Sequence, residues 1–354
     1  MIISRTPFRV SFFGGGTDYP AWFSKHGGAV LATTIDKYCY INCRYLPPFF
    51  DHKYRLIYSK SENCQSIDEI AHPSAREVLR FMKMDRGVEI HHDADLPARS
   101  GMGSSSAFTV GLLNALYALT GRMPNKEKLA KESIYIEQEM IRETVGSQDQ
   151  ILAAYGGFNH ILFFENGDFS VRPVTLTKER IGELNQHLML FFTGVKRTAS
   201  SIAESFIDRM EDNKRQLRIM KDLVDEGISI LSSDQSILGF GELLHEAWLA
   251  KRSLSSKVSN PIVDEIYAEA LKAGAIGGKI TGAGGGGFFL LFVPPEKQEA
   301  VRSQLNFLIQ VPFKFSYSGS QIIYFEPEED FIELEKQREN LPLRAFRDAS
   351  ELKS

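Results

Sequence analysis

The sequence predicts an α+β protein with two domains, and three observations support this class. The chain has 354 residues, about twice the length of an ordinary domain. Strand-like segments gather in residues 1–65, whereas amphipathic helical patterns dominate from residue 199 onward. No internal repeat and no regular alternation of strands with helices is present in the sequence, which argues against a regularly wound α/β sheet.

Periodicity and turn residues predict the elements of the first half. A strand is expected to end at the glycine cluster 14–16, and one or two further strands lie between Ala29 and Tyr45. A helix is expected over residues 72–84 and a short strand over 88–92. The apolar stretch 107–119 has few charges, and it predicts a buried helix that opens at a Gly/Ser turn.

The second half is predicted to be richer in helices. Asn125 is a good N-cap for a helix over residues 126–144. Asn166-Gly167 predicts a tight hairpin between strands 158–164 and 169–174. The other expected elements are strands at 188–192 and 288–293, helices at 199–231, 239–253 and 262–273, a Gly-rich segment at 274–287, and a peripheral helix after Pro327.

Charge and composition exclude several classes of protein. Lys plus Arg number 41 and Asp plus Glu 45, a net charge of −4, so a protein that coats nucleic acid or an anionic membrane is not expected. No apolar run approaches the roughly 18–20 residues that span a bilayer, and the N-terminus lacks the apolar core of a signal peptide, so we expect a cytoplasmic protein. Cys39, Cys43 and Cys64 fit neither a disulfide framework nor a zinc spacing, and free thiols are expected.

The segment LPARSGMGSSSAF at 96–108 has the composition of an anion-binding loop. Its glycines let backbone N–H groups turn toward an anion, and the helix that follows adds the positive end of its dipole. The serine hydroxyls can also reach a metal ion. The Walker A and G-x-G-x-x-G fingerprints are both absent. A loop that merely caps the helix is the alternative.

Helical geometry singles out Glu137. At about 100° per residue, Glu132 and Glu139 point away from the apolar face of the predicted helix 126–144. Glu137 shares that face with Ala130, Ser133, Ile134, Met140 and Ile141. A buried carboxylate needs a partner, so we expect a cation or metal ion beside it, or a structural salt bridge.

Two further segments contain residues that could take part in catalysis or binding. Asp149 lies in the polar stretch GSQDQ at 146–150, which we expect to be a loop. There an aspartate can act as a general base, bind a metal or simply form a turn. In residues 274–287 eight of fourteen are Gly, and the segment leads into the apolar strand FFLLFV. That density allows the backbone to approach another group closely, and a flexible hairpin is the alternative.

The three Gly-containing segments resemble, in order and spacing, the signature motifs of the GHMP family of small-molecule kinases. They read RTPFRVSFFGGGTDYP at 5–20, LPARSGMGSSSAF at 96–108 and KITGAGGGGFF at 279–289. The resemblance implies a ribosomal-protein-S5-like N-terminal domain and a ferredoxin-like C-terminal domain, which we place at 1–180 and 181–340. ATP and a sugar would meet in the cleft between them.

Within the family the chain is most similar to bacterial kinases of D-glycero-D-manno-heptose 7-phosphate, with fucokinase-type kinases next. The similarity lies in SFFGGGTDYP, HGGAVLATTIDKY at 26–38, GSQDQILAAYGGFNH at 146–160 and FFTGVKRTAS at 191–200. Gly15 and Gly16 stand where galactokinases carry Glu-His, which argues against galactose and widens the sugar pocket.

The resemblance also implies roles for individual residues. Asp149 matches the catalytic aspartate and Arg9 the arginine beside it, while Ser105 and Glu137 match the magnesium ligands. The ATP phosphate loop would comprise Pro97, Arg99, Ser100, Gly101, Met102, Gly103, Ser104, Ser105 and Ser106. The substrate side would comprise Gly14, Gly15, Gly16, Thr17, Asp18, Lys37, Arg197, Lys279, Gly284 and Gly285. Arg197 is the first choice for a substrate phosphate, because its planar fork follows a strand that ends at Thr193-Gly194.

The reaction implied by the resemblance is transfer of a phosphoryl group from MgATP to the anomeric hydroxyl of D-glycero-D-manno-heptose 7-phosphate. The product would be the 1,7-bisphosphate, used for GDP-heptose synthesis in bacterial surface glycans. Two alternatives stay open: a fucokinase-like enzyme acting on an unphosphorylated sugar, and a non-catalytic sugar sensor on the same fold. ATP and Mg²⁺ are the expected cofactors. No nucleic-acid or membrane partner is expected, and a homodimer is an open possibility.

Overall fold

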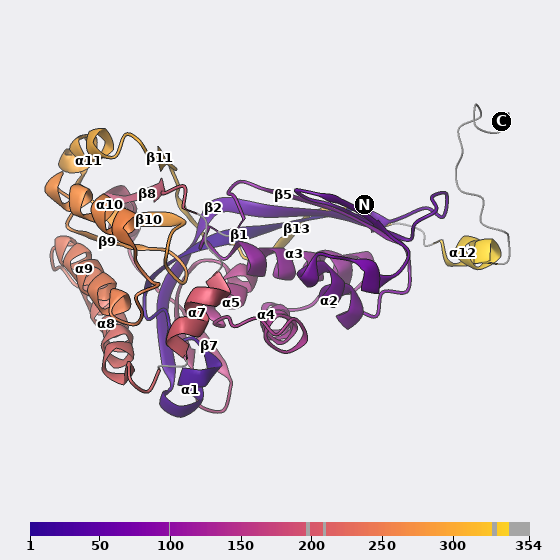
Figure 1. The fold of residues 1–354 in the computed structure, drawn as a ribbon, viewed down its shortest axis with the longest axis horizontal. Coiled ribbons are helices and arrows are strands. Elements are labelled where there is room, and N and C mark those ends of the chain that lie inside the picture. Colours follow the sequence, from indigo (N-terminus) through magenta and orange to yellow (C-terminus); the bar gives the residue numbers. More distant parts are fainter. Residues whose placement is uncertain (99, 196–198, 208–209, 328–330, 340–354) are drawn as a thin grey trace.

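The computed structural model describes residues 1–98, 100–195, 199–207, 210–327 and 331–339. These residues form a mixed fold with two sheets, and the larger sheet runs horizontally through most of Figure 1. The predicted α+β class is therefore confirmed. Within the described residues no helix is long and apolar enough to cross a membrane. The three cysteines are free and buried, as the sequence predicts.

The larger sheet is built around β2 (Gly28–Tyr45), an 18-residue strand. β2 pairs with β1 (Ile2–Phe13) along one side. On its other side it pairs first with β6 (Phe158–Phe163) and then with β5 (Val88–Ala94). Among the described residues the sheet has nine strands; the others are β3 (Tyr54–Ile57), β4 (Ser61–Cys64), β7 (Phe169–Pro173), β12 (Phe315–Ser316) and β13 (Gln321–Phe325).

Helices cover one face of this sheet (Figure 1). α3 (Ser104–Leu119) packs against β1 and β2, and nearly every residue of it is buried, as its lack of charge predicts. The helices beside it are α2 (Pro73–Phe81), α4 (Lys126–Tyr135), which continues into a π-turn at Ile136–Met140, and α5 (Gln148–Tyr155). α1 (Pro20–His26) follows β1, and a 3₁₀ turn covers Ile67–Glu69.

The smaller sheet holds four antiparallel strands in the described part of the chain, in the order β11-β8-β10-β9. They are β8 (Leu188–Phe192), β9 (Gly277–Ile280), β10 (Phe288–Phe292) and β11 (Ile309–Gln310). α9 (Leu238–Arg252) packs on β9, and α8 (Lys214–Ser232) connects this layer to β1 and β2 of the larger sheet. The remaining elements are α6 (Lys178–His187), α7 (Ala199–Ile207), α10 (Pro261–Lys272), a 3₁₀ turn at Pro295–Lys297, α11 (Gln298–Gln304) and α12 (Ile332–Glu339).

Several predicted elements are wrong in extent. The helix predicted over 126–144 leaves α geometry after Tyr135, because a π-turn follows it. The helix predicted over 199–231 is two helices, α7 and α8. The sequence pattern missed the short elements α1, α5, α6, α11, β9, β11, β12 and β13.

The domain boundaries 1–180 and 181–340 stay a prediction. The larger sheet draws strands from both ranges, because β12 and β13 pair with β2 and β1. The chain thus returns to its first sheet after it has built the second.

Candidate active site

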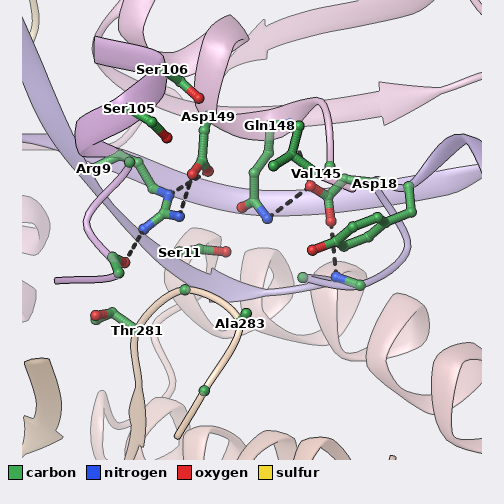
Figure 2. Close-up of a pocket in the computed structure, with 18 of the residues that line it drawn as sticks. Arg9, Ser11, Asp18, Ser105, Ser106, Val145, Gln148, Asp149, Thr281 and Ala283 are labelled. Atoms are coloured by element: carbon green, nitrogen blue, oxygen red, sulfur yellow. Dashed lines mark hydrogen bonds and ion pairs between the residues drawn. The ribbon is translucent and has the colours of Figure 1, made fainter. Parts of the chain in front are cut away.

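The cavity that collects most of the predicted residues lies where four segments meet (Figure 2). The end of β1 and the turn after it form one wall. The start of α3, the turn leading into α5 and the Gly-rich loop between β9 and β10 complete it, with Lys251 of α9 at the side. All three predicted motifs therefore reach one cavity, although they are far apart in the sequence.

Arg9 enters the cavity at an irregular point of β1. The register between β1 and β2 shifts between Pro7 and Arg9, and again between Ser11 and Phe13. Such irregularities redirect side chains, and they occur often beside active sites. The Arg9 N–H donates to the carbonyl of Met102 at 3.1 Å, which ties the phosphate loop to the strand.

Arg9 forms a two-pronged ion pair with Asp149 (Figure 2). Its Nε donates to Asp149 Oδ1 and its Nη2 to Oδ2, each at 2.6 Å, while Nη1 donates to the carbonyl of Gly101 at 2.6 Å. The Arg9 side chain is 5% exposed and that of Asp149 is 23% exposed. The guanidinium is therefore buried behind the carboxylate, which keeps one side open to the cavity.

The prediction that Asp149 lies in a loop is wrong. It lies in the first turn of α5, directly after Gln148. The helix fixes the backbone on which the carboxylate stands, and the ion pair with Arg9 fixes the side chain. Asp149 is thus a rigidly held acceptor at the cavity wall.

Asp18 is a second carboxylate at the cavity. It is fully buried, and among the described residues its side chain accepts hydrogen bonds only from neutral groups. The N–H of Gly16 donates to its Oδ1 at 2.9 Å, and the side chain of Gln148 donates to its Oδ2 at 3.0 Å. Burial raises the pKa of Asp18, and the negative charge of Asp149 raises it further. Figure 2 shows Gln148 between the two aspartates.

The first turn of α3 lies at the cavity, which Ser104, Ser105 and Ser106 help to line. Gly103 is the N-cap residue in a left-handed conformation, and Ser104 begins the helix. A helix N-terminus of this kind favours a phosphate group. Ser105 is exposed at the cavity, whereas Ser106 is buried. The helix start is therefore accessible from the cavity at Ser105.

Glu137 lies behind this helix start, and its burial confirms the facial argument: Glu137 is 1% exposed and Glu139 is exposed. Its Oε2 accepts from Ser106 Oγ at 2.9 Å and from Gln150 Nε2 at 2.5 Å. Its Oε1 is buried without a partner in the described part of the chain. Burial raises the pKa of Glu137 to about 7. The alternative reading, a structural salt bridge, is absent from the described residues, and the unpaired oxygen fits a cation placed beside Ser106.

Two buried lysines flank the other side of the cavity. Lys279 Nζ donates to the carbonyl of Phe12 at 2.8 Å, and Lys251 Nζ donates to the carbonyls of Ile280 and Gly282. Burial, together with the charge of nearby Arg9, lowers the pKa of Lys279 to about 7. Burial and the charge of Lys279 hold the pKa of Lys251 well below its usual range. Among the described residues neither amine forms an ion pair. In its charged form Lys279 keeps two donor hydrogens for an incoming group and Lys251 keeps one.

The structure brings most of the predicted site residues to the cavity but not all of them. Those that line it are Arg9, Gly15, Gly16, Asp18, Gly101, Gly103, Ser104, Ser105, Ser106, Asp149, Lys279 and Gly284. Those that do not are Pro97, Ser100, Met102, Gly14, Thr17, Lys37, Glu137 and Gly285. Lys37 instead pairs with Asp36. Arg99 and Arg197 lie outside the described residues.

Sequence reasoning missed several residues at the cavity, above all Ser11, Gln148 and Lys251. A signal for Lys251 exists in the sequence. Lys251 follows Phe240, Leu244 and Trp248 at helical spacing, so it continues the buried face of α9. The face argument that found Glu137 would have found this lysine too.

A cavity that joins a helix N-terminus, an Arg–Asp pair and a second buried aspartate is suited to phosphoryl transfer to a hydroxyl group. Comparison with known proteins specifies this further. The GHMP kinases N terminal domain matches residues 70–157, and the GHMP kinases C terminal domain matches residues 219–309. The chain belongs to the GHMP kinase family, with that family's two-domain fold, and it is an ATP-dependent kinase.

The relatives that resemble the chain include sugar kinases. It is 30% identical to D-glycero-alpha-D-manno-heptose 7-phosphate kinase of Campylobacter jejuni, over 90% of this chain and 97% of that protein. It is 26% identical to the bifunctional fucokinase/GDP-fucose pyrophosphorylase of Arabidopsis thaliana, over 85% of this chain and 30% of that protein. The crystal structure of a D-glycero-D-manno-heptose 1-phosphate kinase from Bacteroides thetaiotaomicron shares the fold with a TM-score of 0.75, at 24% identity, over 92% of this chain and 100% of that one.

Proposed function

We propose that this chain is a sugar kinase that phosphorylates the anomeric hydroxyl of D-glycero-D-manno-heptose 7-phosphate with ATP, giving the 1,7-bisphosphate for GDP-heptose synthesis. The observation that carries the proposal is the ion pair of Arg9 and Asp149 beside the N-terminus of α3, in one cavity with Asp18. The similarity to the heptose 7-phosphate kinase of C. jejuni supports the choice of sugar.

The proposed chemistry uses groups that the cavity already holds in place. The N–H groups at the start of α3 would bind the ATP phosphates. Asp149, held by Arg9, would accept the proton of the anomeric hydroxyl as its oxygen bonds to the γ-phosphorus and ADP leaves. Asp18 would accept hydrogen bonds from sugar hydroxyls. Orientation and charge neutralisation, more than covalent catalysis, would lower the barrier.

Magnesium would bind at the same end of the cavity, beside Ser105 and in front of the buried Glu137. Glu137 and Ser105 would hold it together with the ATP phosphates, and the unpaired Oε1 of Glu137 is an oxygen ligand of the kind Mg²⁺ prefers. The bound ion would supply positive charge for the phosphates. The described residues contain no group of three or more acidic, His or Cys side chains able to hold a metal alone, so the nucleotide itself would complete the coordination.

A phosphorylated sugar needs a cationic contact away from the reacting carbon, because a desolvated phosphate is costly without partners. Lys279 and Lys251 are buried at the cavity, and in their charged forms each has at least one unused donor hydrogen. An anion beside them would favour their charged forms. These two lysines therefore support a substrate with a phosphate, and we add Lys251 to the residues proposed from the sequence.

A second candidate is a fucokinase-like kinase that acts on an unphosphorylated sugar. The match to a fucokinase over 85% of this chain favours it. In that case the two lysines would contact ATP phosphates instead. A non-catalytic sensor is disfavoured, since a sensor would not need the Arg9–Asp149 ion pair that the proposed reaction uses.

The decisive experiment measures ADP production with MgATP and a panel of sugars. The panel contains D-glycero-D-manno-heptose 7-phosphate, the free heptose, L-fucose, D-galactose and D-mannose 6-phosphate. We expect the heptose 7-phosphate to give the highest kcat/KM, by at least about 100-fold over the free heptose. Equal rates with both would remove the phosphosugar claim and leave the free-sugar kinase. No turnover with any sugar would favour the sensor.

A further inference from the structure

A small recess in the cavity wall is bounded by Gly15, Ser11 and Gln148. A methyl group placed on the Cα of Gly15 would lie 3.6 Å from Gln148 Nε2 and 3.7 Å from Ser11 Oγ. The recess therefore has room for at least one carbon or oxygen atom, and the two atoms nearest to it are polar. Figure 2 shows Gln148 beside Asp149, with Ser11 below them.

The polar atoms around the recess are incompletely hydrogen-bonded. Ser11 is 6% exposed and Gln148 is 9% exposed. Ser11 Oγ and Gln148 Oε1 have no hydrogen-bond partner among the described residues. Gln148 Nε2 uses one of its two hydrogens on Asp18. Buried polar atoms without partners are costly, so their presence at a cavity wall indicates a bound group that completes them.

We propose that this recess binds a hydroxyl of the sugar other than the one that is phosphorylated, with Ser11 and Gln148 as its hydrogen-bond partners. The proposal rests on the sugar-kinase function above and identifies residues that select the sugar. A hydroxyl both donates and accepts, which matches the donor and acceptor groups of Ser11 and Gln148. A phosphate is disfavoured in the recess, because the Asp18 carboxylate, which Gln148 contacts, would repel it.

Gly15 offers a clean test, because its backbone does not have a positive φ. Alanine therefore fits the backbone, and its methyl group makes only ordinary contacts while it fills the recess. For Gly15→Ala we expect the KM for the sugar to rise about 10-fold or more. The KM for ATP should stay within about twofold, and Tm should stay within about 2 °C. Gly182→Ala in α6 is the matched control, since nothing lies within 4 Å of the added methyl, and it should change neither KM.

A second test removes the proposed hydrogen bond in two ways: by replacing Ser11 in the enzyme, or by removing a hydroxyl from the sugar. Ser11→Ala is assayed with heptose 7-phosphate and with each of its ring monodeoxy analogues, using ADP production. For one analogue, Ser11→Ala and the unmodified enzyme should have equal kcat/KM, because the hydroxyl that Ser11 binds is already missing. Gly15→Ala should prefer that analogue over the full sugar, which reverses the native preference. A merely structural role for Ser11 would lower kcat/KM for every sugar alike.

The inference is overturned if Gly15→Ala and Ser11→Ala leave the KM for every sugar within twofold, or if they raise the KM for ATP instead. Failure of the proposed function looks different. In that case the unmodified enzyme does not phosphorylate heptose 7-phosphate. The monodeoxy analogues are then made from the sugar of the panel that has the highest kcat/KM. The two variants then test the recess with that sugar.

Discussion

Asp149 is the residue whose replacement should separate chemistry from binding. Asp149→Asn keeps the shape of the side chain but removes the acceptor charge that faces the cavity. We expect kcat to fall by about 10²–10⁴-fold, the usual loss for a general base, while the affinity for ATP stays unchanged. Steady-state kinetics and calorimetric ATP titration measure the two effects, with Tm as the control for folding. Near-normal turnover would show that phosphoryl transfer here needs no proton acceptor at residue 149.

Lys279 makes the stability of the protein depend on pH. Its pKa is about 7 in the folded protein and about 10.4 in an unfolded chain. Between these values the unfolded chain binds more protons, so stability rises with pH from about 7 to 10. At and below pH 7 the full cost of the buried charge is present, on the order of a few kcal/mol.

Lys279→Met should therefore flatten this rise. Urea unfolding at pH 6.5, 8 and 9.5 measures it, and we expect the variant to gain most over the native protein at pH 6.5 and least at pH 9.5. Lys272→Met, on the exposed surface of α10, is the control and should follow the native profile. Parallel profiles for Lys279→Met and the native protein would mean that Lys279 titrates normally.

At the residue scale, the sequence predicted the burial of side chains that follow a helical period. It missed residues whose role depends on a contact with a distant segment. The burial of Glu137 follows from its place on a helix face, and the structure confirms it. Ser11 faces the cavity beside a register shift of β1, and no local pattern encodes such a shift. Gln148 matters because Asp18, 130 residues earlier in the chain, accepts its hydrogen bond.

Helices and strands were predicted best where an apolar run or a helical spacing continues through the whole element. α3, β8, β10 and α10 were found from apolar runs or clear helical spacing. The break after α4 could not be seen, because the apolar spacing continues through the π-turn while the hydrogen-bond pattern changes. α5 begins directly at the polar stretch that holds Asp149, so its first turn reads as a loop. Short edge strands such as β12 carry too few residues for any periodicity.

At the scale of elements, the phosphate loop and the Gly-rich loop between β9 and β10 pack so closely that neither can shift without the other. A methyl group on Gly101 would lie 2.7 Å from the carbonyl oxygen of Thr281, closer than atoms can approach. Gly101→Ala should therefore push the two loops apart and raise the KM for ATP by about 10-fold or more.

Gly121→Ala is the matched control for this contact. Gly121 has φ 69° against 77° for Gly101, but nothing lies within 4 Å of its added methyl. Both variants carry the strain of a left-handed alanine, on the order of 1–2 kcal/mol. Only Gly101→Ala should lose ATP affinity in a nucleotide titration. An equal loss in both variants would assign the effect to backbone strain alone.

For the whole molecule, the sheet pairing predicts where the chain can be shortened. β13 borders β1, and the N-terminal amine of Met1 donates to the carbonyl of Glu326. A chain that ends after Pro327 keeps every strand of the larger sheet, so we expect Tm within a few degrees of the native value and undiminished kcat. A chain that ends after Val311 loses β12 and β13, and we expect it to unfold or aggregate. Thermal unfolding followed by circular dichroism compares them, and a cooperative, native-like Tm for the shorter chain would contradict this expectation.

The pairing of β1 with β13 also has a consequence for the synthesis of the protein. β1 is synthesised first, but its second neighbouring strand, β13, is complete only when residues 321–325 have been translated. At about 5–20 residues per second, the wait lasts roughly 15–65 s. During this time one edge of β1 is open, and an open strand edge pairs readily with other chains. Slow translation of the codons for residues 14–325 should therefore lower the yield of folded enzyme more than equally slow translation of the codons after residue 325.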